Sequence, residues 1–151
     1  MKYRIIAITV LFFVSALLTA GGPPPSENKY VKFSASLKQD KLKAGSKGLL
    51  LIKLEPQSGI HINLQPPMSL KLEDTSAVRL GSKLEFSKIK KDTSEFLDAS
   101  KPITQPFMIV KDAKPGVATL TATLTYFYCS DADGWCSRFR QPVDMKINVV
   151  H

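Results

Sequence analysis

The clearest strand pattern of the chain lies in residues 119–129, where two kinds of side chain alternate. The apolar face carries Leu120, Ala122, Leu124, Tyr126 and Tyr128. The other face carries threonines and continues through Phe127 and Cys129. A period of two predicts a strand with one buried face. If the alternation continues, Cys129 leaves the strand on the threonine face, which predicts an accessible sulfur rather than a buried one.

The same alternation recurs along the rest of the chain and sets the predicted fold class. Half-buried strands are predicted at residues 31–38, 60–65 and 143–149, and residues 49–54 predict a strand buried on both faces or nearly so. Residues 87–102 are polar and irregular, which predicts a loop with room for one helical turn. About seven to nine short strands without a long helix predict an all-β, immunoglobulin-like antiparallel β-sandwich.

The chain divides into three predicted segments. Residues 1–22 have the form of a secretory signal peptide, with a basic start, a short apolar run and small residues at the end. The apolar run is shorter than the roughly 20 residues of a membrane span, and an uncleaved N-terminal anchor is the alternative. Residues 23–29 predict a Pro-rich tether, and residues 30–151 predict one domain. We therefore expect an exported protein.

Charge and motifs exclude several function classes. The net charge of +8 indicates attraction to acidic surfaces or partners, including an envelope surface. The lysines are spread along the chain without a binding motif, so no nucleic acid is expected as a partner. No Ser-His-Asp arrangement or recognisable carboxylate pair supports a hydrolase. Cys129, Cys136 and His61 are one ligand short of a closed zinc site, and neither a metal nor another cofactor is expected.

The only two cysteines, Cys129 and Cys136, enclose six residues rich in turn formers, so they are predicted to lie at the mouth of a hairpin. In an exported protein such a pair tends to be oxidised. A structural bridge around this short loop contributes about 2.5 kcal/mol. A redox pair instead requires accessible sulfurs and controlled exchange. The negative charges of Asp131 and Asp133 disfavour a thiolate at either cysteine, and the positive charge of Arg138 offsets this effect. Both interpretations stay open. The spacing is not Cys-x-x-Cys, which excludes a thioredoxin-type site.

Residues 121–150 resemble the family of N-terminal periplasmic domains of DsbD thiol:disulfide interchange proteins. The shared features are an aromatic strand end, Cys129, an Asp-Ala loop, Gly134 with Trp135, Cys136 and a closing strand. The segment 59–63 resembles the family's segment beside its active site, and 94–96 resembles its cap loop. The resemblance extends over about residues 30–150.

This resemblance implies a periplasmic thiol-disulfide oxidoreductase with an immunoglobulin-like fold. It implies that electrons arrive from a membrane-embedded, DsbD-like thiol transporter and leave to periplasmic thioredoxin-fold or disulfide-isomerase proteins. Cys129 and Cys136 are then the redox pair, and Phe96 is the cap that shields the sulfurs. Glu95, His61 and Asn63 are neighbours that tune the pair or its docking surface. Because no membrane or thioredoxin-like domain follows in the sequence, the electron donor is expected to be a separate protein.

The chain also departs from the family pattern, and other interpretations stay open. The cysteine loop is one residue longer, His61 and Asn63 replace tyrosines, and Ser94 replaces an acidic residue. His61 is alternatively a surface histidine, Phe96 a residue that pins its loop to the core, and Trp135 a hairpin aromatic. For the whole protein, the alternative is an exported immunoglobulin-like binding module whose hairpin disulfide is purely structural.

Overall fold

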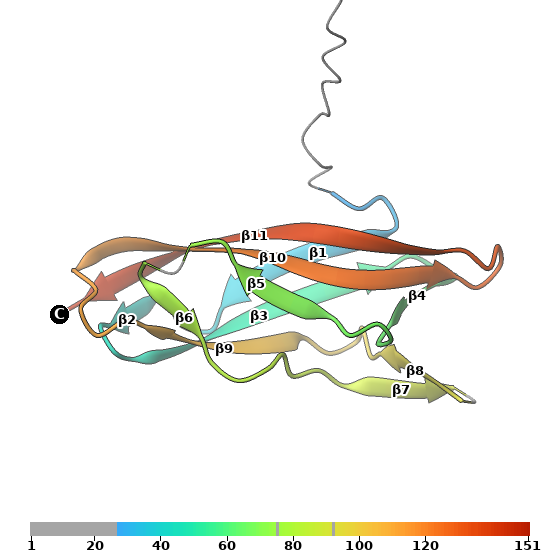
Figure 1. Cartoon of the computed structure of the whole chain (residues 1–151), viewed down its shortest axis with the longest axis horizontal. Helices are drawn as coiled ribbons and strands as arrows, with labels where there is room; N and C mark the ends of the chain where they lie inside the picture. Colours follow the sequence, from blue (N-terminus) through green and yellow to red (C-terminus); the bar gives the residue numbers. More distant parts are fainter. Residues whose placement is uncertain (1–26, 75, 92) are drawn as a thin grey trace, which may run out of the picture.

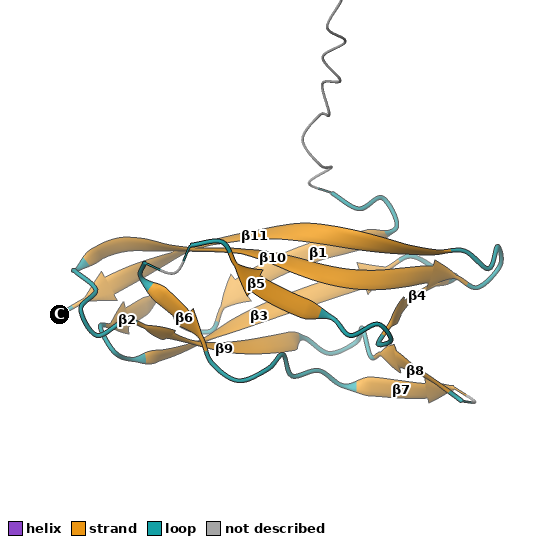
Figure 2. Ribbon diagram, viewed as in Figure 1, coloured by secondary structure: helices purple, strands orange, loops and turns teal. Residues whose placement is uncertain are grey.

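The computed structural model describes residues 27–74, 76–91 and 93–151, and within these ranges all regular structure is strand (Figures 1 and 2). The strands are β1 (Val31–Leu37), β2 (Lys41–Lys43), β3 (Lys47–Pro56), β4 (Ile60–Asn63), β5 (Ser69–Leu72), β6 (Val78–Leu80), β7 (Lys88–Lys91), β8 (Ser94–Leu97), β9 (Ile103–Ile109), β10 (Gly116–Ser130) and β11 (Cys136–Val150). Among these residues no helix has the length and apolarity to cross a bilayer. The predicted signal peptide, residues 1–22, and residues 23–26 of the tether lie outside the described ranges.

The strands form two sheets that pack as an immunoglobulin-like β-sandwich. The smaller sheet has the order β1-β3-β9-β6, and the larger has the order β2-β11-β10-β4-β8-β7, with β5 pairing to β10 as well. All pairings are antiparallel except that of β2 with β11. The predicted fold class is therefore confirmed.

The core lies between the two sheets and follows the alternation in the sequence. Leu120, Leu124 and Tyr126 of β10 are fully buried, and they share the core cluster with Ile52 of β3 and Phe107 of β9. Full burial of each such apolar side chain contributes about 1.5–3 kcal/mol. The inner face of β10 is therefore fixed by packing, which leaves its outer face, with the threonines, available for other roles.

Strands β10 and β11 form a long hairpin that organises the larger sheet. Their register runs without interruption from Gly116 opposite Val149 to Cys129 opposite Cys136. The turn of this hairpin lies at one end of the molecule, the end that also holds β4, β7 and β8, whereas the C terminus lies at the other end (Figure 1). The two cysteines are therefore at the end where three other strands of the larger sheet, β4, β7 and β8, lie.

The structure corrects one prediction about residues 87–102. They hold the β7–β8 hairpin rather than a loop with a helical turn. Strand β8 joins the larger sheet where Phe96 pairs with Asn63 of β4. The polar sequence gives no period-two signal here because both strands are short and only Leu97 is buried. Pairing with a strand distant in sequence, and not local pattern, makes this segment extended.

Candidate functional site

A disulfide joins Cys129 at the end of β10 to Cys136 at the start of β11. The two residues are direct register partners, with their Cα atoms 4.1 Å apart. The next pair toward the turn is hydrogen-bonded, since Ser130 N–H donates to the carbonyl of Trp135 over 2.9 Å. Cysteines in the neighbouring, non-hydrogen-bonded position have the closest Cα approach of an antiparallel ladder. The hairpin register therefore brings the two sulfurs together.

The turn between the cysteines has its own local anchors. Gly134 has a φ of 66°, a left-handed conformation that glycine adopts without steric cost. Gly134 N–H donates to the carbonyl of Ser130, and Asp131 N–H donates to the carbonyl of Gly59. Gly59, with a φ of 77°, lies in the turn before β4. The cysteine loop is thereby tied to the strand that supplies His61 and Asn63.

The two cysteines differ sharply in exposure. Cys129 is only 4% exposed. It nevertheless lies outside the core cluster, because its side chain is on the outer face of the larger sheet. Cys136 is exposed. The prediction that Cys129 is accessible is therefore wrong: the face was predicted correctly, but neighbouring strands cover the sulfur. Reagents reach this disulfide from the Cys136 side.

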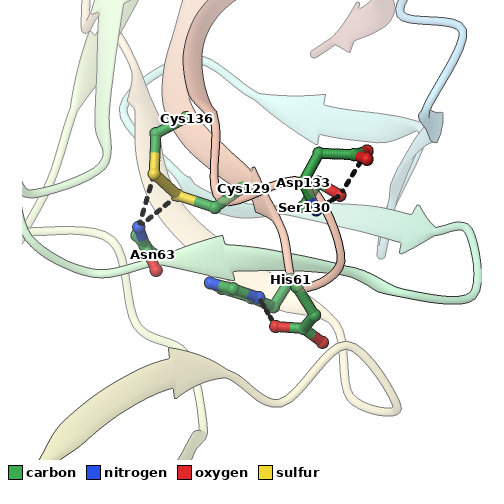
Figure 3. Close-up of a disulfide and its surroundings, with 7 residues drawn as sticks. His61, Asn63, Cys129, Ser130, Asp133 and Cys136 are labelled. Atoms are coloured by element: carbon green, nitrogen blue, oxygen red, sulfur yellow. Dashed lines mark hydrogen bonds and ion pairs between the residues drawn. A yellow bond between two sulfur atoms is a disulfide. The ribbon is translucent and has the colours of Figure 1, made fainter.

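Asn63 of β4 contacts the disulfide directly. Its Nδ2 donates to Sγ of Cys129 over 2.7 Å and lies 3.9 Å from Sγ of Cys136 (Figure 3). Asn63 is opposite Phe127 in the β4–β10 register, two pairs away from Cys129 and therefore on the same face of the sheet. A donor placed on a sulfur stabilises negative charge there more than it stabilises a neutral disulfide. The Asn63 amide is therefore positioned to favour the reduced form of Cys129.

His61 lies directly opposite Cys129 in the β4–β10 register. Its Nδ1 is 2.7 Å from Oδ1 of Asp131, which follows Cys129 closely in the turn (Figure 3). Its ring contacts the Phe96 ring edge-on, with centroids 4.3 Å apart. His61 is only partly exposed, so it is a bridge between the cysteine loop and β8 rather than an isolated surface histidine.

Phe96 and Glu95 point in opposite directions from β8. Phe96 is half-buried beside His61 and opposite Asn63. The Glu95 carboxylate instead accepts a 2.9 Å hydrogen bond from Lys88 Nζ, and the Lys88 ammonium lowers the pKa of Glu95. The structure thus brings Phe96 to the neighbourhood of the disulfide, whereas Glu95 is paired within its own hairpin.

Trp135 lies on the other face of the hairpin from Cys136. Its ring packs against Tyr30 and Tyr128, with centroids 5.0 and 5.7 Å away. Its Nε1 donates to Oδ2 of Asp133 over 3.3 Å. This is the geometry of an aromatic residue that packs across the hairpin, and it holds the turn against the start of β1.

Sequence reasoning missed two features of the site. It did not link Asp131 to His61, and it did not find that Ile89 lies beside Phe96, since the β7–β8 hairpin was not predicted. No local signal marks either feature, because both depend on which strands pair, including the β4–β10 pairing that places His61 opposite Cys129. Among the described residues, no group of three His, Cys, Asp or Glu side chains is arranged to hold a metal ion.

Comparisons with known proteins include a distant structural likeness. A scan against protein-family models and a search of curated protein sequences return no match. Among solved structures, the chain is similar to the seventh ScaB type I cohesin of Pseudobacteroides cellulosolvens, with a TM-score of 0.45 and 13% identity, over 78% of this chain and 92% of that chain. A likeness this distant carries no information about function.

Proposed function

We propose that this protein is a periplasmic thiol-disulfide exchange carrier whose redox pair is Cys129 and Cys136. The observation that carries the proposal is the asymmetry of the disulfide: Cys136 is exposed, whereas Cys129 is buried outside the core with the Asn63 amide on its sulfur. A bridge that only braces a core has no need of one accessible sulfur and one shielded sulfur with a hydrogen-bond donor. Exchange requires both access and control.

The asymmetry assigns a role to each cysteine. In the reduced domain, the exposed Cys136 thiolate attacks a partner disulfide, forms a mixed disulfide and releases one partner thiol. Cys129 then attacks Sγ of Cys136, re-forms the internal bridge and releases the second partner thiol. The domain loses two electrons and the partner gains them. A membrane-embedded thiol transporter restores the dithiol by the reverse steps, and periplasmic thioredoxin-fold or disulfide-isomerase proteins are the acceptors.

The side chains around the sulfurs have supporting roles in this proposal. Phe96, edge-on to His61 and opposite Asn63, shields Cys129 from small oxidants and stray thiols. His61 holds the cysteine loop through Asp131. Glu95 holds the β7–β8 hairpin through Lys88, so its contribution is to the shape of the shield and not to the sulfurs.

The reduction potential of the Cys129–Cys136 pair tests the proposal. The domain is equilibrated in glutathione buffers, and free thiols are trapped and counted by mass spectrometry. A carrier is expected between about −120 and −270 mV, the range of catalytic couples. A value below about −300 mV marks a structural disulfide and contradicts the proposal.

One observation favours the second candidate, an exported binding module with a structural bridge. The disulfide joins direct register partners at the end of an uninterrupted ladder, where it braces the open end of the hairpin. Replacing both cysteines with serine separates the two functions. A carrier stays folded and loses exchange with a glutathione disulfide probe, whereas a braced binding module has no exchange to lose.

A further inference from the structure

Five strands place one side chain each in a single row beside the disulfide, on the outer face of the larger sheet. Arg138 of β11 is opposite Phe127 of β10, Phe127 is opposite Asn63 of β4, Asn63 is opposite Phe96 of β8, and Phe96 is opposite Ile89 of β7. Register partners point to the same face of a sheet. We call these five residues the flanking row. It runs parallel to the cysteine pair, two residues farther from the turn on β11.

The apolar members of the flanking row do not serve the core. Ile89 is 50% exposed, and Phe96 and Phe127 are half-buried. None of the three belongs to the core cluster or to the residues packed against it. Partly exposed aromatic and aliphatic side chains that lie outside the core are typical of surfaces that contact another protein.

The β11 end of the row is strongly basic. Arg138 and Arg140 share the outward face of β11 with Cys136, two and four residues along the strand. With a rise of about 3.3 Å per residue, they lie about 7 and 13 Å from Cys136. Both are exposed. In the part of the chain that the structure describes, neither guanidinium has an ion pair or hydrogen bond.

The other side of the disulfide has the opposite sign. The cysteine loop carries Asp131 and Asp133, but both carboxylates already have partners, His61 for the first and Ser130 and Trp135 for the second. These contacts turn the Asp131 carboxylate toward His61 and the Asp133 carboxylate toward Ser130 and Trp135, whereas the two arginines share the outward face of β11 with Cys136. Charges arranged on one side of a reactive atom set the orientation of a docking molecule and its association rate.

We propose that the flanking row and Arg140 form the docking surface for an acidic protein segment that carries the partner cysteine. Carboxylates of the partner, placed to one side of its cysteine, pair with Arg138 and Arg140 while that cysteine reaches Cys136. Apolar side chains of the partner cover Ile89, Phe96 and Phe127. This inference rests on the proposed function and adds the chemistry of the partner.

Coulomb's law gives the size of the expected effect. Opposite unit charges about 7 Å apart in water change a rate constant by about threefold, and a like pair changes it by about the same factor in the other direction. Two probes that differ only in charge sign should therefore differ by about tenfold in rate at low ionic strength. The difference should shrink at about 0.5 M salt, where the screening length falls below the separation.

The test uses two synthetic peptides as probes. They are identical except for two residues after their single cysteine, which are glutamates in one and lysines in the other, and each cysteine carries a neutral 2-thiopyridyl disulfide. The reduced domain attacks the peptide disulfide, the peptide S–S bond breaks and 2-thiopyridone leaves. Cys129 then displaces the peptide thiol from Cys136. Release of 2-thiopyridone, followed by its absorbance, gives the second-order rate constant.

The reduced wild-type domain is expected to react about tenfold faster with the glutamate peptide, and the double variant Arg138→Glu with Arg140→Glu should reverse that preference. The control variant combines Lys41→Glu with Lys146→Glu. It has the same net charge change on the same sheet face, but Lys146 is about 33 Å from Cys136 along β11. The control should keep the wild-type preference.

Two results overturn the docking inference: equal rates of the wild-type domain with both peptides, or equal loss of preference in the control and arginine variants. Either result leaves the proposed function intact if the reduction potential lies in the catalytic range. A potential in the structural range removes the carrier and its docking surface together. The two failures are therefore read from separate measurements.

Discussion

The Asn63 side-chain amide donates a 2.7 Å hydrogen bond to Sγ of Cys129, although the two residues are 66 positions apart in the chain. The contact exists because β4 pairs with the end of β10, with Asn63 two register pairs from the cysteine. This polar contact on the shielded sulfur links the fold to the chemistry proposed for the disulfide.

Replacing Asn63 with leucine should lower the reduction potential of the disulfide by about 30 mV, which corresponds to about 1.4 kcal/mol. The amide hydrogen bond is stronger to a thiolate than to a neutral sulfur, so its loss destabilises the reduced form more than the disulfide. Glutathione equilibration measures the shift. The matched control is Asn148→Leu. Asn148 of β11 lies on the same face of the larger sheet as Asn63, but far from the sulfurs. An unchanged potential for Asn63→Leu would show that the hydrogen bond has no redox role.

The two cysteines should differ in reactivity when each is present alone. Cys136 in the Cys129→Ser variant should react with iodoacetamide on the order of ten times faster than Cys129 in the Cys136→Ser variant, because accessibility limits the rate. Mass spectrometry of timed samples measures both rates. Both variants are repeated in urea, where the difference should vanish. Equal rates in the folded state would contradict the assignment of Cys136 as the attacking sulfur.

Replacing both cysteines with serine should destabilise the domain by about 2.5 kcal/mol without preventing folding. The bridge closes a short loop, and the core cluster of the two sheets stays complete. In urea the midpoint should fall by about 1–2 M, given the usual denaturant slopes. Circular dichroism follows the transition. A chain that fails to fold without the disulfide would favour the structural interpretation of the bridge.

Phe96→Ala should raise the rate at which dithiothreitol reduces the disulfide by about threefold or more, since removal of the ring opens access to Cys129. Stability should change by less than about 1 kcal/mol, because Phe96 lies outside the core cluster. Met108→Ala, which removes an exposed side chain from β9 of the other sheet, is the control. If the two variants are reduced at the same rate, Phe96 does not act as a shield.

The buried phenol of Tyr126 should make the folded state less stable at alkaline pH. Its burial raises the pKa of the phenol to about 12, against the hydrogen bond from Asn28 that lowers it. The pKa of tyrosine in the unfolded chain is about 10. Because folding raises the pKa of Tyr126, its contribution to the stability of the folded state is complete below pH 10 and is lost as the pH rises from 10 to 12. The loss is about 1.4 kcal/mol per pH unit. In Tyr126→Phe this part of the pH dependence should disappear from urea titrations, and parallel curves for the two proteins would refute the assignment.

Much of the fold was predictable from local pattern. The period of two in β10 identified the buried face that holds Leu120, Leu124 and Tyr126, and the turn formers between the cysteines predicted the hairpin. These features are local because alternation and turn chemistry depend on neighbouring residues. The same reasoning placed Cys129 on the outer face of its strand.

The sequence by itself therefore determined the strand character of the chain, the core face of β10 and the pairing of Cys129 with Cys136. Only the tertiary structure decided that Cys129 is covered, that Asn63 reaches its sulfur and that residues 88–97 form a hairpin beside it. Each of these depends on which strands lie side by side in a sheet. That order is set by packing between segments distant in the chain, and no local pattern of side chains records it.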